Sequence, residues 1–220
     1  MSDSKKTIYT FLGLPASGKG TQAKILASSL EIKMVSAGDL IRGIMTNDSR
    51  DPFVAEIKKR YDAGIPQPDE VVVDLFAKFL DESNKSVILD NFPFSLGQAS
   101  FLDRYIESHP DWNGPIIVFI KLEPEIAVKR AISRKICSDC GMIYGMTDEM
   151  ICEKCGGSLL VRSDDNEETM RTRIGHYLPR LNELVEYYNK NKGSLLEING
   201  DKTVAEVSEE IKGKIDQYSK

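Results

Sequence analysis

The sequence predicts an α/β fold in which a five-stranded parallel sheet lies between two layers of helices. One observation is that β-rich runs alternate with stretches whose apolar residues recur at helical spacing, an alternation typical of a parallel sheet covered on both faces. Another is a glycine-rich loop that directly follows the first of these runs and opens a helix. The expected strands cover residues 7–12, 32–36, 86–90, 115–121 and 194–198.

The stretches between the strands carry the apolar stripes of amphipathic helices. A long stripe runs from Met170 to Tyr188, and Thr203 with Glu206 forms a capping-box pattern that begins a closing helix. We interpret these stripes as core packing. Two segments interrupt the alternation, residues 38–66 and 137–164, and we expect both to be insertions at the ligand-binding edge of the sheet.

The composition describes a globular protein and argues against several classes. The chain has 220 residues, of which 41% are apolar and 29% are charged, which is enough to bury one substantial core. Its net charge of −5 argues against a nucleic-acid partner, because binding to a duplex requires a surplus of lysine and arginine. The longest strongly apolar run, residues 116–120, is too short to cross a bilayer, and the N-terminal residues lack a hydrophobic signal core. We therefore expect no membrane partner and a cytoplasmic location.

The strongest motif is the loop Gly13-Leu14-Pro15-Ala16-Ser17-Gly18-Lys19-Gly20-Thr21. Its glycines let successive N–H groups turn inward, the helix N-terminus adds partial positive charge, and Lys19 reaches the outer phosphates of a nucleotide. The motif predicts a phosphate-binding loop (P-loop) for ATP and a three-layer fold of the P-loop NTPase class. A glycine-rich turn without a ligand is the weaker interpretation, because it leaves the lysine unexplained. The residues expected to contact ATP are Gly13, Ala16, Ser17, Gly18, Lys19, Gly20 and Thr21.

Other charged residues suit the transfer of a phosphoryl group. Asp90 ends the third expected strand, where a carboxylate can order the waters of the Mg²⁺ that accompanies ATP. Arginines neutralise the equatorial oxygens of a moving phosphate with planar donor forks. Arg130 and Arg134 lie four apart, which predicts a shared helix face, and Arg162 and Arg173 lie near the far end of the second insertion. The predicted catalytic residues are Lys19, Asp90, Arg130, Arg134, Arg162 and Arg173.

All four cysteines fall within the second insertion as two Cys-x-x-Cys pairs. Eleven residues separate the pairs, a spacing that can wrap a tetrahedral zinc ion in a small ribbon. Four free thiols in so polar a segment are the less favoured interpretation, because unligated cysteines tend to be buried. The pattern suggests no open coordination position. We therefore expect a structural Zn²⁺, in a reducing compartment, held by Cys137, Cys140, Cys152 and Cys155.

Three motifs resemble those of the adenylate kinase family, and the resemblance covers nearly the whole chain. They are the P-loop, with glycine rather than serine or threonine after the lysine, the segment Ser-Ala-Gly-Asp-Leu-Ile-Arg at 36–42, and the charged stretch at 162–173. The resemblance implies a reversible reaction in which Mg-ATP and AMP give two ADP, catalysed by a monomer. It also implies a lid whose closure brings Arg134 and Arg162 onto the phosphates. The implied parts are a core domain at 1–35, 67–136 and 165–220, a monophosphate-binding (NMP) subdomain at 36–66 and a zinc-binding lid at 137–164.

The same resemblance implies further contacts. The base or ribose of ATP would lie against Ile143 and Tyr144, and Arg134 and Lys202 would complete the ATP site. Gln98, two turns into its helix, would hydrogen-bond the adenine edge of the acceptor. The acceptor-binding residues implied in this way are Ala37, Arg42, Gln67, Asn91, Phe94, Gln98, Arg162 and Arg173, with Arg42 holding the phosphate.

The chain departs from the family's pattern at two acceptor positions. Ala37 stands where the family has threonine, and Phe94 stands where the family has an arginine that clamps the acceptor phosphate. Losing one charge-assisted bond to a phosphate weakens binding by about 1.5–3 kcal/mol if nothing compensates. Three interpretations follow: another cation moves in and the acceptor remains AMP, which we favour; the acceptor is another monophosphate such as UMP or CMP; or the chain is a catalytically weak nucleotide sensor or scaffold.

Overall fold

The central sheet has the five parallel strands that the sequence predicts. The computed structural model describes residues 5–46, 51–62, 65, 67–161, 165–191 and 195–218. The strands are β1 (Lys6–Leu12), β2 (Lys33–Ser36), β3 (Val87–Asp90), β4 (Trp112–Lys121) and β8 (Leu195–Asn199). They lie in the order β2-β3-β1-β4-β8, and every neighbouring pair is parallel. The largest difference from prediction is that β4 begins at Trp112, which is buried and pairs with Lys6 of β1.

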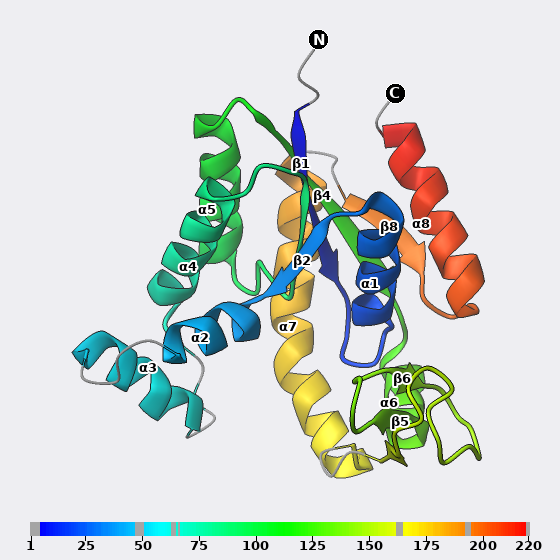
Figure 1. Ribbon diagram of the computed structural model, residues 1–220. Helices are drawn as coiled ribbons and strands as arrows, with labels where there is room; N and C mark the ends of the chain where they lie inside the picture. Colours follow the sequence, from blue (N-terminus) through cyan, green and yellow to red (C-terminus); the bar gives the residue numbers. More distant parts are fainter. Residues whose placement is uncertain are drawn as a thin grey trace.

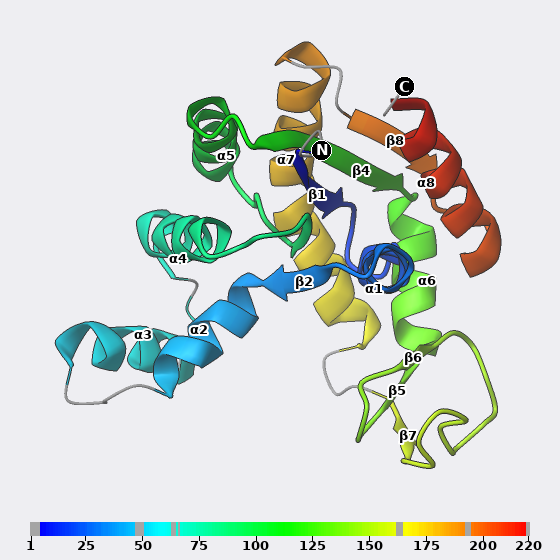
Figure 2. The same ribbon diagram turned by 45° about the horizontal axis from the view of Figure 1, so that its top comes forward.

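Helices form a layer on each face of this sheet (Figures 1 and 2). One face carries α1 (Lys19–Leu30) and α8 (Val204–Tyr218). The other face carries α4 (Asp69–Asp81), α5 (Leu96–Ser108), α6 (Pro124–Ser133) and α7 (Glu167–Asn191). Side chains of β1 alternate between the two layers, since Tyr9 and Phe11 pack with the first group of helices and Ile8 and Leu12 with the second. The predicted three-layer architecture is confirmed.

The strand order opens a crevice at the carboxyl ends of β1 and β3. From β1 the chain passes through α1 to β2, on the far side of β3, whereas from β3 it passes through α5 to β4, on the far side of β1. The two connections therefore diverge between neighbouring strands. In open α/β sheets this switch point is where ligands bind. The P-loop follows β1, and Asp90 ends β3, so both lie at this edge.

The two predicted insertions form separate structures that lie on opposite sides in Figure 2. The first contains α2 (Ala37–Met45) and α3 (Pro52–Asp62), and α2 begins with a capping box between Ser36 and Asp39. The second contains a three-stranded antiparallel sheet of β5 (Lys135–Cys137), β6 (Ile143–Tyr144) and β7 (Leu159–Leu160). Within the described ranges, no helix is long and apolar enough to span a bilayer.

Candidate active site

The loop between β1 and α1 has the backbone geometry that a bound phosphate requires. Gly13 has a φ of +151°, and a Cβ there would lie 2.7 Å from both the Ile120 carbonyl oxygen and the Ser17 Oγ. Gly18 caps α1 in the left-handed conformation with a φ of +96° and provides no side-chain cap. The first amides of α1 therefore have no capping oxygen from this residue, and they add the positive end of the helix dipole.

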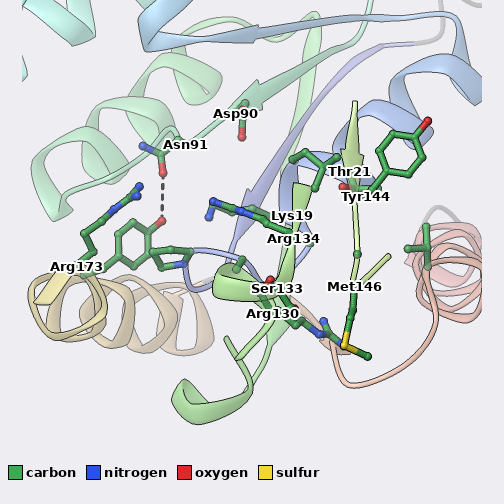
Figure 3. A pocket seen from close by; sticks show the side chains of 18 of the residues that line it. Lys19, Thr21, Asp90, Asn91, Arg130, Ser133, Arg134, Tyr144, Met146 and Arg173 are labelled. Carbon is green, nitrogen blue, oxygen red and sulfur yellow. Dashed lines mark hydrogen bonds between the residues drawn. The ribbon is translucent and has the colours of Figure 1, made fainter. Parts of the chain in front are cut away.

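A cleft of about 1070 Å³ opens beside this loop (Figure 3). Its walls come from the P-loop, the end of β3, the end of α6, the β6 strand of the second insertion, one side of α7 and the start of α8. The structure thus brings together most of the residues predicted for the ATP and transfer sites. Those that line the cleft are Ala16, Gly18, Lys19, Gly20, Thr21, Asp90, Arg130, Arg134, Ile143, Tyr144, Arg173 and Lys202, and the predicted acceptor residues Asn91 and Phe94 line it as well.

Lys19 and Asp90 form the electrostatic centre of the cleft. The Lys19 ammonium donates to the Leu14 carbonyl oxygen at 3.2 Å. Desolvation lowers the pKa of Lys19 to about 8; the Asp90 charge opposes this shift, and the positive charges of Arg173 and Arg134 add to it. Burial raises the pKa of Asp90, whereas Lys19 lowers it. A single carboxylate thus offsets only part of the cost of this crowded ammonium, and an entering anion would offset more.

The predicted arginines are held by internal partners at the cleft wall. Arg134 binds Asp165 through two hydrogen bonds of 2.6 and 2.8 Å, and the side chain of Asp165 is fully buried. Arg130 donates to the Gly200 carbonyl oxygen at 2.9 Å and lies 3.6 Å from Asp201. The prediction that Arg130 and Arg134 share a helix face is wrong, because α6 ends at Ser133 and Arg134 is its extended C-cap residue. Arg162 falls outside the described residues.

Only some of the residues predicted to bind the acceptor line the cleft. Of the described ones, Ala37, Arg42, Gln67 and Gln98 do not line the cleft. Arg42, on the exposed side of α2, pairs with Asp39 at 2.6 Å. Gln67 donates to the Ile57 carbonyl oxygen at 2.9 Å.

Gln98 lies in a different position from the one expected. It is in the first turn of α5, not two turns in, because α5 begins at Leu96. It is buried, and its amide is already engaged at both ends. The Nε2 atom donates to Asp69 at 2.7 Å, and the Oε1 atom accepts from the Phe94 N–H at 2.7 Å. A contact with a base would require Gln98 to share or exchange these bonds.

Three further residues of α7 line the cleft: His176, Tyr177 and Arg180. The sequence analysis did not assign them to it. The Tyr177 ring lies 5.0 Å from the Phe94 ring, and its hydroxyl donates to Asn91 Oδ1 at 3.1 Å, the dashed line in Figure 3. Asn91 has a φ of +57°, a left-handed conformation that asparagine tolerates well. With Arg173, these residues follow helical spacing of three or four, the signal that could have identified them. Tyr177 was instead assigned to the core stripe.

The second insertion gathers the four cysteines into one cluster. Their sulfur atoms all lie within 4.8 Å of one another, and none is in a disulfide. The Cys137–Cys155 and Cys140–Cys152 sulfur pairs are 3.4 and 3.6 Å apart, close to the roughly 3.8 Å that four Zn–S bonds of about 2.3 Å impose on a tetrahedron. The hydroxyl of Tyr144 donates to Cys152 Sγ at 3.3 Å and lowers the pKa of that thiol to about 6. The donor set and its spacing therefore fit a tetrahedral zinc ion.

The fold and the cleft together define the class of protein. A P-loop lies at the switch point of a parallel sheet, and a partly buried lysine and several arginines surround the space in front of it. This arrangement is typical of P-loop proteins that bind nucleoside phosphates and transfer phosphoryl groups.

Comparison with known proteins identifies the family within this class. The family model described as adenylate kinase matches residues 11–193. The chain is 36% identical to the adenylate kinase of Syntrophotalea carbinolica over 91% of this chain and 94% of that protein. It is equally 36% identical to the adenylate kinases of Thermotoga neapolitana, over 90% and 93%, and of Archaeoglobus fulgidus, over 91% and 94%. The chain belongs to the adenylate kinase family of nucleoside monophosphate kinases.

We expect Gly13→Ala to disrupt the P-loop, because its Cβ would collide with Ile120 and Ser17 atoms at 2.7 Å. The free energy of unfolding should fall by about 1–3 kcal/mol in a urea titration. Gly20→Ala is the matched control, since its Cβ meets nothing within 4 Å and alanine favours a helix. Equal stability of the Gly13→Ala variant and the unchanged protein would contradict this account.

Proposed function

We propose that the chain transfers the terminal phosphate of Mg-ATP to AMP, reversibly and in line, to give two ADP. The observation that carries the proposal is the crowded Lys19 ammonium at the P-loop, which shares one cleft with Arg130, Arg134 and Arg173. Such a cleft stabilises the charge of a phosphoryl group in transit and requires no covalent intermediate on the protein. Membership of the adenylate kinase family supports AMP as the acceptor.

The residues of the cleft take distinct parts in this reaction. Backbone amides at Gly18 and Gly20 and the Lys19 ammonium bind the outer phosphates of ATP. Asp90 orders the waters of the Mg²⁺ that enters with ATP, which suits a half-buried carboxylate at the end of β3. Arg134 and Arg173 neutralise the group in transit. Arg130 and Lys202 line the ATP side of the cleft, and Ile143 and Tyr144 of the lid cover the base or ribose.

The two insertions complete the site by closing over it. Residues 36–66 form the NMP subdomain. Arg42 of this subdomain and Gln98 of α5 approach the acceptor after exchanging their bonds with Asp39 and Asp69. Residues 137–164 form the lid, which already contributes Ile143 and Tyr144 to the cleft wall. Closure of both expels water, so the phosphate passes to AMP and not to a water molecule.

The proposed reaction is tested by incubating the purified protein with Mg-ATP and AMP, UMP or CMP in turn. We expect ADP to form fastest with AMP, and Lys19→Met to lower kcat about 100- to 1000-fold, because the main charge at the outer phosphates is lost. Lys78→Met on α4, an exposed lysine outside the cleft, is the control. Faster turnover with UMP or CMP would reassign the acceptor. Failure with all three would favour a nucleotide sensor.

Binding of Mg-ATP should take up a proton above neutral pH. The pKa of Lys19 is about 8 in the free protein, and bound phosphates raise it, so at pH 8 about half a proton enters per ATP. The affinity of the protein for Mg-ATP is therefore highest below pH 8, and it falls by up to about tenfold per pH unit above pH 8. Calorimetry in buffers of different ionisation enthalpy measures this uptake. Lys19→Arg, which does not titrate in this range, should abolish it, and equal uptake by both proteins would contradict the assignment.

We propose that Cys137, Cys140, Cys152 and Cys155 hold one structural Zn²⁺. The lid has little core of its own, since its buried cluster contains only Cys137, Cys152 and Leu159 among the described residues. A zinc ion supplies four strong bonds where such a core is missing and leaves no coordination position for substrate. The four cysteine sulfur atoms therefore suit a structural, non-catalytic metal, as the sequence analysis expected.

Metal analysis should find about one zinc per chain in the reduced protein. Cys137→Ser should lose the metal and make the lid sensitive to protease within residues 137–161, while the core stays resistant. Ser138→Ala is the matched control, because its hydroxyl donates to Asp139 and not to a sulfur atom. Retention of a full zinc complement by Cys137→Ser would argue against the four-cysteine site.

A further inference from the structure

A series of contacts between two cations and two aromatic rings runs along the wall of the cleft. The guanidinium carbon of Arg180 lies 5.2 Å from the centre of the Phe94 ring. Phe94 in turn lies 5.0 Å from the Tyr177 ring, which is tilted by 51° to it, and the Lys19 ammonium lies 5.4 Å from the Tyr177 ring. All four residues line the cleft. The series therefore connects the P-loop to a second positive charge, on α7, across two rings.

Hydrogen bonds hold the loop that carries the Phe94 ring. Its backbone N–H donates to Gln98 Oε1 at 2.7 Å, and Gln98 Nε2 donates to Asp69 Oδ1 at 2.7 Å. The neighbouring Ser95 hydroxyl donates to the other oxygen of Asp69 at 2.5 Å. These bonds tie the loop after β3 to the starts of α4 and α5. The backbone that carries the ring is therefore held by two partly buried hydrogen bonds and one exposed one, independently of any ligand.

The contact with the Phe94 ring uses none of the hydrogen-bond donors of Arg180. A guanidinium that lies over a ring is attracted by the ring's π-system and keeps its five N–H groups for other partners. Arg42, Arg134 and Arg171 each pair with a carboxylate. Among the described residues, Arg180 has no carboxylate within ion-pair distance, and its contact is the Phe94 ring. Its donor edge is thus available to an anion in the cleft.

The place of Arg180 suits the acceptor and not the donor. Lys19 marks the outer phosphates of ATP at the P-loop, and in-line transfer requires the acceptor phosphate on the opposite side of the moving group. In the series of contacts that starts at Lys19, Arg180 comes last, beyond the Tyr177 and Phe94 rings. A monophosphate there needs charge-assisted donors, preferably planar forks.

We propose that Arg180, held on the Phe94 ring, binds the phosphate of the acceptor nucleotide. The inference rests on the proposed function, because it assigns a residue to the acceptor side of the same site. It also gives Phe94 a role: the ring that stands where the family resemblance implies an arginine supports a cation supplied by α7. The positive charge is retained at the acceptor phosphate, but it comes from another element.

The test compares steady-state kinetics and binding for Arg180→Gln. We expect the KM for AMP to rise about 10- to 100-fold, as for loss of one charged bond to phosphate, while the Kd for Mg-ATP stays within about twofold. Binding of adenosine, which lacks the phosphate, should not change. Arg104→Gln on α5, an exposed arginine bonded to Ser100, is the matched control and should leave all three values unchanged.

A charge-relocation variant makes the test sharper. The double substitution Phe94→Arg with Arg180→Met moves the cation to the other side of the contact, and it should recover most of the affinity for AMP that Arg180→Gln loses. Phe94→Leu, which removes the ring and keeps Arg180, should raise the KM for AMP less than Arg180→Gln does.

The outcomes separate this inference from the proposed function. If the unchanged protein makes no ADP from ATP and AMP, the proposed function fails, and with it the acceptor role of Arg180. If the unchanged protein is active but Arg180→Gln keeps its KM for AMP, only the inference is overturned. Equal weakening of AMP and adenosine binding would also overturn it, because the lost contact would then not involve the phosphate.

Discussion

The site depends on one electrostatic constraint, an ammonium group crowded by protein atoms at the switch point of the sheet. Desolvation of Lys19 is opposed by Asp90 but reinforced by Arg173 and Arg134, so the free cleft has more positive than negative charge at its centre. The surrounding backbone contributes in the same sense, since the uncapped start of α1 adds its dipole. An anion of several charges is the ligand that relieves this imbalance, and the strand order puts the space for it directly in front of the P-loop.

Three other arginines lie at ion-pair distance from carboxylates in this structure. Arg134 is bound to Asp165, Arg130 lies near Asp201, and Arg42 is bound to Asp39. A phosphate carries more charge than a carboxylate and can compete with it for each of these guanidinium groups. An arginine that binds phosphate would therefore exchange one partner for another, and no free side chain would have to be ordered. The buried Asp165 holds Arg134 at the cleft wall before any ligand binds, which limits the side-chain entropy lost on binding.

Arg180 is held in a different way. Its partner is a ring, which orients the guanidinium but leaves its donors unpaired among the described residues. A carboxylate partner would have to be displaced by phosphate, whereas the ring can stay in place. Phe94 stands where the family resemblance implies an arginine. The positive charge at the acceptor site need not fall as a result, because an arginine on another element that packs against the same space can supply it.

The sequence by itself determined the features that depend on short-range geometry. Strand alternation, the P-loop between Gly13 and Thr21 and the two Cys-x-x-Cys pairs are local patterns, and the structure confirms the sheet, the loop geometry and the gathering of the four sulfur atoms. The helix face proposed for Arg134 and the depth of Gln98 in α5 were wrong, since both depended on the residue at which a helix ends or begins.

The tertiary structure alone decided which distant side chains share the cleft. Phe94 and Arg180 lie far apart along the chain and meet because α5 and α7 pack on the same face of the sheet. Periodicity assigned Tyr177 to the core stripe, and the residue does pack against the core, but periodicity cannot tell which residues at the edge of such a stripe also face a cavity. That distinction depends on the position of the neighbouring elements, which only the packed fold supplies.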